Sequence, residues 1–228
     1  PKVGALNFYG FDPRLTVDPN TAPAKRCDIM HVGHYWWRWD ELSKFILPSL
    51  ERIRSQIGGV SFVGSWWSGT PPTPIDQGLE QAFRADGALF QRLGIAVEPA
   101  VPYTQVVSKM SEGRVNIMTQ RPLFKELRLL TSKYFEIFAA DTIPMVMLEP
   151  DHAEEVYGTD GRHLALHGNV AERLLEALER PSHYAEIVVA VRDHLKKHHS
   201  YRQRVGELVA ALSKEHVVAC RERRVAWG

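Results

Sequence analysis

Short apolar runs alternate with longer amphipathic stretches along the chain, and this alternation constrains the fold more than any other feature. Residues 28–33 (Asp-Ile-Met-His-Val-Gly) and 59–64 (Gly-Val-Ser-Phe-Val-Gly) are apolar runs that end at glycine, which is typical of buried strands. Repeated units of a short strand followed by a helix predict a parallel sheet covered on both sides. We therefore predict an α/β protein with a Rossmann-like parallel sheet of about six strands, sandwiched by helices.

The same patterning locates the remaining elements. We predict further strands at residues 95–100, 115–118, 143–148 and 163–166. Helices are predicted at 39–57, 75–93, 103–110, 124–140 and 169–178, followed by one long helix or two from 182 to about 212. Pro48 lies inside the first of these helices and predicts a kink or a break there. Asn169 and Glu172 form a capping box that opens the helix ending at Leu178.

The domain boundaries follow from changes in composition. Residues 1–26 are rich in proline and show little periodicity, so we interpret them as an extended linker. Residues 27–212 are predicted to form the Rossmann-like domain, and residues 213–228 a basic C-terminal tail. A chain of 228 residues buries roughly 70% of its unfolded surface, so it needs no disulfide or metal to fold.

The charge balance and the cysteine content disfavour several classes of protein. Lys and Arg number 28 against 27 Asp and Glu, whereas a nucleic-acid binder carries a strongly basic face. No apolar run approaches the roughly 20 residues of a membrane helix. Cys27 and Cys220 form no CxxC motif, which suits a reducing compartment. We therefore expect a cytoplasmic protein that binds no nucleic acid and has no membrane span.

The sequence contains no strong metal or nucleophile motif. His194 and His198 share a helical face, but no third ligand lies at a supporting distance, and HExxH and DxD motifs are absent. No GxSxG motif is present, and neither cysteine has a convincing histidine partner in sequence. We therefore expect no metal and no cofactor, and a hydrolase with a covalent nucleophile is disfavoured.

Candidate binding residues follow the predicted strands, because ligands bind beyond the carboxyl ends of a parallel sheet. Gly33 and Gly64 end two strands, where a missing side chain lets backbone N–H groups approach a phosphate, although glycine also ends ordinary strands. In residues 131–136 (Thr-Ser-Lys-Tyr-Phe-Glu) the hydroxyls and Lys133 suit an anion. Glu136 is a lone carboxylate in an apolar stretch. It either lies at a helix edge or is paired with a cation, or it accepts hydroxyl groups from a sugar ring.

Several motifs together resemble one enzyme family. Residues 116–147, which include Thr131–Glu136, are similar to the donor-site stretch of glycosyltransferases with two facing Rossmann domains, the GT-B type. Residues 7–13 resemble the linker between those domains, residues 28–33 the first strand of the second domain, and residues 198–204 its closing helix. The resemblance runs from residue 7 to about 212. It is strongest to the CgeB-like, spore-maturation-protein type of glycosyltransferase.

The resemblance implies the C-terminal, donor-binding half of a glycosyltransferase. This half would bind a nucleoside-diphosphate sugar for transfer to an acceptor hydroxyl, with the acceptor held by an N-terminal domain or a partner subunit. Arg38 and Lys133 would stabilise charge on the leaving diphosphate in place of a metal. Glu136 would bind the ribose, and the nucleobase would lie near Tyr103. The donor phosphates would meet Gly33, His34, Thr131 and Ser132.

Three positions depart from the family pattern. Lys133 stands where the family has arginine, Asp141 where it has the turn glycine, and Arg128 where it has the first glutamate of an E-x7-E pattern. These departures motivate an alternative, a non-catalytic glycosyltransferase-like scaffold whose surface would be lined by exposed tryptophans (Trp36, Trp37, Trp39, Trp66 and Trp67). A dinucleotide enzyme is a third alternative, which the absence of GxGxxG disfavours.

Overall fold

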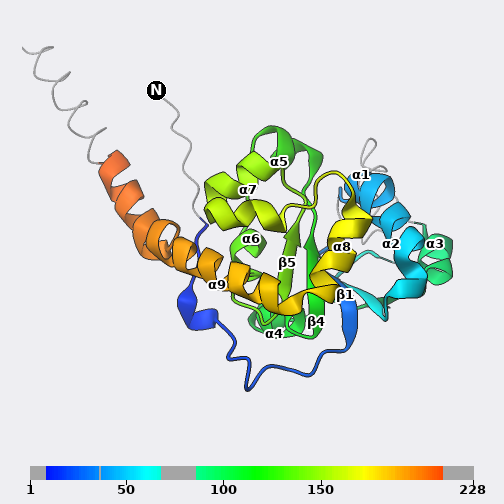
Figure 1. Cartoon of the computed structure of the whole chain (residues 1–228). Helices are drawn as coiled ribbons and strands as arrows, with labels where there is room; N and C mark the ends of the chain where they lie inside the picture. The colour runs from blue at the N-terminus through cyan, green and yellow to red at the C-terminus, as the bar shows by residue number, and fades with distance from the viewer. Residues whose placement is uncertain (1–8, 36, 68–85, 213–228) are drawn as a thin grey trace, which may run out of the picture.

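The computed structural model describes residues 9–35, 37–67 and 86–212, and it contains one parallel sheet (Figure 1). The strands lie in the order β3-β2-β1-β4-β5, and every neighbouring pair is parallel. Their bounds are β1 Cys27–Val32, β2 Val60–Val63, β3 Ile95–Glu98, β4 Gly113–Met118 and β5 Ile143–Val146. The sheet is flanked by helices, so the predicted α/β class is confirmed.

The central strands are apolar on both faces because helices cover both faces of the sheet. In β1, Ile29 and Met30 point to opposite faces, and neither is exposed to solvent. All four residues of β2 and of β5 are buried as well. Among the described strands, β3 pairs only with β2, and its Val97 is exposed.

Helices lie between the strands and follow the last of them, β5. They are α1 Trp39–Glu41, α2 Leu47–Ile53, α3 Gly87–Arg92, α4 Val106–Met110, α5 Pro122–Glu126, α6 Lys133–Glu136, α7 Pro150–Tyr157, α8 Val170–Glu179 and α9 Pro181–His198. Helix α2 packs against α8, and α4 packs against β1 and β4. Figure 1 shows α8 and α9 crossing in front of the sheet. A break at His199 separates α9 from a further helical segment at 201–212, so the C-terminal stretch forms two helices rather than one.

The predicted kink near Pro48 is confirmed and takes the form of a widened turn. A π-helical turn at Leu42–Ile46 separates α1 from α2, and Pro48 lies in the first turn of α2. Proline lacks an N–H group and its ring crowds the carbonyl one turn earlier, so a regular helix could not continue through this position. Asn169 caps α8 as expected, because its side chain accepts a hydrogen bond from the Glu172 N–H at 3.5 Å.

Two predicted elements are wrong. The helix predicted at 124–140 is divided into α5 and α6, because Arg128 adopts a positive φ of 50° that interrupts the helix. The strand predicted at 163–166 is replaced by a 3-10 helix at Thr159–Leu164. Only Ala165 then pairs with the sheet, through a single bridge to Val146, before the chain turns into α8. The part of the chain that the structure describes therefore has five strands rather than six.

Residues 9–26, here called the N-terminal strap, run along the outside of the domain (Figure 1). Phe11 donates its N–H to the His199 carbonyl at 2.8 Å, and Val17 donates to the Ala139 carbonyl at 2.8 Å. Arg26 donates to the Glu112 carbonyl at 2.7 Å just before β1 begins. The strap is therefore tied to three separate parts of the domain. The predicted tail at 213–228 and most of the helix predicted at 75–93 lie outside the described residues.

Candidate functional site

A cavity of about 330 Å³ lies at the carboxyl ends of β1 and β2, facing α6; we call it the carboxyl-edge cavity. From β1 the chain adds β2 and β3 on one side of the sheet and then β4 and β5 on the other side. Ligands bind in open parallel sheets beside such a reversal of the strand order. The residues that line it are Val32, Gly33, His34, Val63, Gly64, Ala100, Val101, Tyr103, Val106, Ser132, Lys133 and Glu136. Six predicted site residues therefore lie together: Gly33, His34, Tyr103, Ser132, Lys133 and Glu136.

Two glycines form the floor of this cavity because their backbones approach closely. A Cβ atom on Gly64 would lie 2.0 Å from the Gly33 carbonyl oxygen, and Gly64 also has a positive φ of 153°. The indole Nε1 of Trp67 donates to the same Gly33 oxygen at 2.9 Å. No side chain other than hydrogen fits at Gly64, so glycine is required here for packing and not merely as an end to a strand.

Lys133 provides the cation of the cavity. It lies in the first turn of α6 and is half-buried, and no hydrogen bond or ion pair joins its ammonium to any residue that the structure describes. Burial lowers the pKa of Lys133; Glu136 opposes this shift, and Arg38 adds to it. A partly buried ammonium without a partner is costly, and a bound anion would relieve that cost.

Glu136 provides the carboxylate of the cavity, with its two oxygens in different states. The Tyr103 hydroxyl donates to Oε1 at 2.8 Å. Oε2 is buried and has no hydrogen-bond partner among the described residues. Leaving such an acceptor unsatisfied costs about 1–3 kcal/mol. The structure therefore excludes the exposed-edge alternative for Glu136, because the residue is only 8% exposed.

The remaining polar residues of the cavity come from the loop after β1 and from the start of α6. The His34 Nδ1 accepts a hydrogen bond from the Ser65 N–H at 3.2 Å, and burial, with Lys133 nearby, lowers the pKa of His34. His34 is therefore neutral at pH 7. Ser132 occupies the N-cap position of α6, and its side chain makes no capping bond. Thr131 is adjacent to Ser132 but does not line the cavity.

Arg38 lies behind the cavity rather than in its wall. Its Nε donates to the His34 carbonyl at 2.8 Å, and its Nη1 donates to the hydroxyl of Thr119 at 3.0 Å and to the Thr119 carbonyl. Only 8% of Arg38 is exposed. These bonds tie the loop after β1 to the end of β4. Sequence reasoning placed Arg38 with the donor diphosphate, whereas the structure brings it against main-chain oxygens.

His31 and Glu41 are two buried residues near this edge that sequence reasoning missed. His31 Nδ1 is 2.8 Å from the Ile117 carbonyl, Nε2 has no partner among the described residues, and burial lowers the pKa of His31 to about 3. Glu41 Oε2 accepts from the Gln120 N–H, and burial raises the pKa of Glu41 to about 7. A polar residue within an apolar run could have indicated His31, whereas Glu41 lies among other charged residues and carries no such signal.

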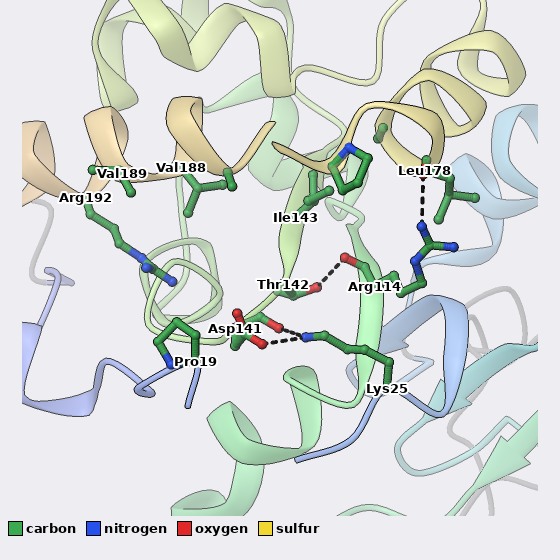
Figure 2. A pocket seen from close by; sticks show the side chains of 13 residues that line it. Pro19, Lys25, Arg114, Asp141, Thr142, Ile143, Leu178, Val188, Val189 and Arg192 are labelled. Carbon is green, nitrogen blue, oxygen red and sulfur yellow. Dashed lines mark hydrogen bonds and ion pairs between the residues drawn. The ribbon is translucent and has the colours of Figure 1, made fainter. Parts of the chain in front are cut away.

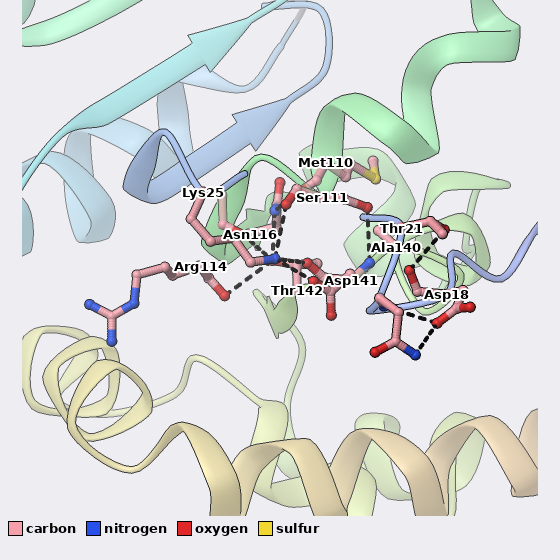
Figure 3. Close-up of polar contacts among 12 residues, drawn as sticks. Asp18, Thr21, Lys25, Met110, Ser111, Arg114, Asn116, Ala140, Asp141 and Thr142 are labelled. Carbon is pink, nitrogen blue, oxygen red and sulfur yellow. Dashed lines mark hydrogen bonds and ion pairs between the residues drawn. The ribbon is translucent and has the colours of Figure 1, made fainter. Parts of the chain in front are cut away.

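A second cavity, of about 410 Å³, lies at the opposite, amino-terminal edge of the sheet; we call it the amino-edge cavity (Figure 2). Its wall includes apolar residues of α8 and α9 and three cations, Lys25, Arg114 and Arg192. Figure 3 shows that Lys25 reaches the Ser111 carbonyl and Asp141, with Nζ to Oδ2 at 2.8 Å.

The two arginines of the amino-edge cavity, like Lys25, donate hydrogen bonds to oxygen atoms of the protein itself. Arg192 donates to the carbonyls of Phe138 and Ala140 at 2.6 and 2.8 Å. Arg114 donates to Asp28 and to the Leu178 carbonyl at 3.1 and 3.0 Å. These cations hold the fold together, and this larger cavity is therefore not the candidate functional site.

Other possible site types find no support in the described ranges. Within residues 9–35, 37–67 and 86–212, no three His, Cys, Asp or Glu side chains gather so that they could hold a metal ion. Within the same ranges, no helix has both the length and the apolar character needed to cross a membrane. The expected surface of exposed tryptophans is wrong for the described ones: Trp67 is fully buried, Trp37 is half-buried, and Trp39 and Trp66 are half-buried and pack against the core. Trp36 lies outside the described residues.

A family model for glycosyl transferase-like proteins matches residues 39–210, so this chain belongs to that family. No curated protein matches the sequence. Among solved structures, a point mutant of T4 phage BGT in complex with UDP-glucose matches with a TM-score of 0.56 and 12% sequence identity, over 85% of this chain and 49% of that chain. The DNA-modifying enzyme β-glucosyltransferase, determined with and without uridine diphosphoglucose, matches with a TM-score of 0.57 and 13% identity, over 85% and 52%.

A third similar structure is α,α-trehalose 6-phosphate synthase from Burkholderia multivorans. It matches with a TM-score of 0.57 and 13% identity, over 85% of this chain and 44% of that chain. These neighbours are GT-B glycosyltransferases, and the five-stranded parallel sheet therefore has a fold found in that class. The chain spans about half the length of the solved structures that it matches.

Proposed function

We propose that this chain is the donor-binding half of a GT-B glycosyltransferase, of the CgeB-like type, and that residues 27–212 bind a nucleoside-diphosphate sugar. The observation that carries the proposal is that one cavity holds the ammonium of Lys133, which no described residue binds, and the buried Oε2 atom of Glu136, which has no hydrogen-bond partner among the described residues. A nucleoside diphosphate supplies the complement of both, an anion and a hydroxyl-bearing ribose. Neighbours of the same fold are solved with UDP-glucose or UDP, which supports the same ligand class.

The cavity suggests how the sugar transfer would be assisted. When the bond between the sugar and the diphosphate breaks, negative charge increases on the leaving diphosphate. Lys133, which lines the cavity, would stabilise that charge, and the Gly33–Gly64 floor would bring backbone close to it without an intervening side chain. Arg38 would act from behind by fixing the loop that carries His34. The acceptor hydroxyl would come from a second domain or subunit, and the donor would require no metal.

The test is a thermal-shift titration with UDP, GDP, dTDP, CDP and ADP, comparing the parent chain with Glu136→Ala. A ligand at about a hundred times its dissociation constant stabilises a fold by about 2.7 kcal/mol, which shifts the midpoint clearly. We expect one diphosphate to shift the parent and to lose that shift in Glu136→Ala. Glu179→Ala, at an exposed carboxylate of α8, is the control and should keep the shift. If no diphosphate shifts the parent, the proposal is wrong.

One observation favours the scaffold alternative. Arg128, at the position where the resembling family has a glutamate, forms ion pairs with Asp151 at 3.1 Å and with Glu155 at 2.6 Å. Its side chain is therefore used in holding α7 and is not directed to a sugar. A scaffold could still bind a nucleotide but would show no donor hydrolysis or transfer by the intact protein, so turnover distinguishes the two functions.

A further inference from the structure

The hydrogen bond between Tyr103 and Glu136 connects two segments that are far apart in the sequence. Tyr103 lies in the 3-10 turn Tyr103–Gln105 between β3 and α4, whereas Glu136 ends α6. Their side chains meet at 2.8 Å, and both line the carboxyl-edge cavity. The bond therefore joins one wall of the cavity to another.

Packing does not account for this tyrosine. Tyr103 is 68% exposed, so its ring contributes little to the core, while Glu136 is almost fully buried. Within the described ranges, the hydroxyl of Tyr103 is the one side-chain donor to Glu136. Lys133, the nearby cation, forms no ion pair with Glu136 there. The bond to Glu136 raises the pKa of Tyr103 to about 12, so the hydroxyl stays protonated and remains a donor at neutral pH.

The surroundings restrict how a ligand could reach the carboxylate. On the side away from the cavity, a space of only about 10 Å³ separates Tyr103 and Glu136 from the N-terminal strap and Tyr201. That space is too small for a sugar ring. A ligand hydroxyl would therefore approach Glu136 from the carboxyl-edge cavity, with Oε1 already accepting the Tyr103 hydroxyl and Oε2 without a partner among the described residues.

We propose that Tyr103 is a positioning residue that holds Glu136 through Oε1 and leaves Oε2 as the single acceptor for one ribose hydroxyl. This inference rests on the proposed donor-binding function. It adds a specificity: the cavity selects a ribonucleotide over the matching deoxyribonucleotide by one hydroxyl group, and the other ribose hydroxyl contributes little. A carboxylate that was free at both oxygens could instead bind both hydroxyls of the ribose equally.

The experiment measures binding of UDP, 2′-deoxy-UDP and 3′-deoxy-UDP to the parent chain, Tyr103→Phe, Glu136→Gln and Tyr201→Phe by calorimetry. For the parent we expect one deoxy analogue to bind about tenfold more weakly than UDP and the other within about threefold of UDP. Tyr103→Phe should weaken UDP about fivefold and reduce the tenfold preference to threefold or less, because Glu136 is no longer held in one orientation. Tyr201→Phe, at another partly exposed tyrosine beside Glu136, should change neither quantity.

Several outcomes would overturn the inference. If both deoxy analogues lose affinity equally in the parent, Glu136 binds both hydroxyls and Tyr103 does not reserve one oxygen. If Tyr103→Phe keeps the parent's preference while Glu136→Gln loses UDP affinity, the donor site stands and the role of Tyr103 is wrong. If UDP and the four other diphosphates all fail to bind the parent, the proposed function is wrong and this inference with it. Tyr103→Phe leaves the buried Glu136 without its side-chain donor, so its unfolding midpoint should fall, and a single cooperative thermal transition above the assay temperature shows that the variant is folded.

Discussion

The two cavities at opposite edges of the sheet contain similar kinds of residues but use them differently. The amino-edge cavity has three cations, and each is bonded to carbonyl or carboxylate oxygens of the protein itself. The smaller carboxyl-edge cavity has one cation, Lys133, that is bonded to no described residue, and one carboxylate, Glu136, with an unsatisfied oxygen. Size and charge alone would have favoured the amino-edge cavity.

The difference shows how polar groups that serve the fold can be separated from those that await a ligand. Buried polar groups in folded proteins are nearly always hydrogen-bonded, so each exception needs an explanation. At the amino edge, the cations close helix ends and turns, which accounts for their presence. At the carboxyl edge, the unsatisfied groups gather in a cavity at the position in the sheet where ligands bind. The comparison predicts that changes at the two edges have opposite consequences for stability and binding.

The largest expected effect is on the floor of the carboxyl-edge cavity. Gly64→Ala should lower the free energy of unfolding by more than about 4 kcal/mol, because the new Cβ would meet the Gly33 oxygen at 2.0 Å. Chemical denaturation measures the change. Gly87→Ala is the control, since nothing lies within 4 Å of a Cβ there. A Gly64→Ala variant as stable as the parent would show that these two backbones are not in contact in solution.

A pH-dependent effect should come from Glu41, which is buried beside the end of β4. Its pKa is about 7 in the folded protein against 4.5 as the reference value, so the folded protein holds this proton more tightly than the unfolded chain. The parent should therefore lose stability relative to Glu41→Gln as the pH rises from about 4.5 to about 7, by up to about 3 kcal/mol. Denaturation at pH 4.5 and pH 8 tests this, with the exposed Glu51→Gln as the control. A constant gap between parent and Glu41→Gln would contradict it.

At the amino edge, a cation should matter for stability and not for binding. Arg192→Gln should lower the free energy of unfolding by about 2 kcal/mol, because the carbonyls of Phe138 and Ala140 lose a charged donor. Affinity for the nucleoside diphosphate should stay within threefold of the parent. The control is Arg180→Gln, which removes an exposed ion pair to Glu176 and should cost less than about 0.5 kcal/mol. Lost binding with unchanged stability in Arg192→Gln would contradict the comparison.

The smallest expected effect is at the carboxyl edge, where a cation should matter for binding and not for stability. Lys133→Gln should weaken nucleoside-diphosphate binding at least tenfold, about 1.4 kcal/mol, and leave the unfolding midpoint unchanged or slightly raised. Lys25→Gln should instead lower the unfolding midpoint and leave nucleoside-diphosphate binding unchanged, since the Lys25 ammonium is bonded to Ser111 and Asp141. Calorimetry and thermal melting on both variants measure the two quantities. Unweakened binding in Lys133→Gln would remove Lys133 from the donor site.

The sequence pattern predicted those strands and helix breaks that are set by neighbouring residues along the chain. Strands β1, β2, β4 and β5 were predictable because their apolar runs are buried on both faces, and the break at Pro48 because proline cannot continue a helix. The division between α5 and α6 was not predictable, since Arg128 carries no residue-level signal for a positive φ. The same holds for residues 163–166, where an apolar run suited a strand and tertiary packing allowed one bridge.

For the candidate site, the sequence determined which side chains were unusual, and the tertiary structure decided what each one contacts. Glu136 could be singled out because a lone carboxylate in an apolar stretch needs a reason to be there, and Lys133 because it follows two hydroxyl residues that together suit an anion. That Arg38 turns toward Thr119, that Tyr103 reaches Glu136, and that His31 lies behind Gly33 depended on strand order. Hydrogen-bond partners separated by 33 or 81 residues are set by which strands are neighbours in the sheet, and a linear pattern does not contain that information.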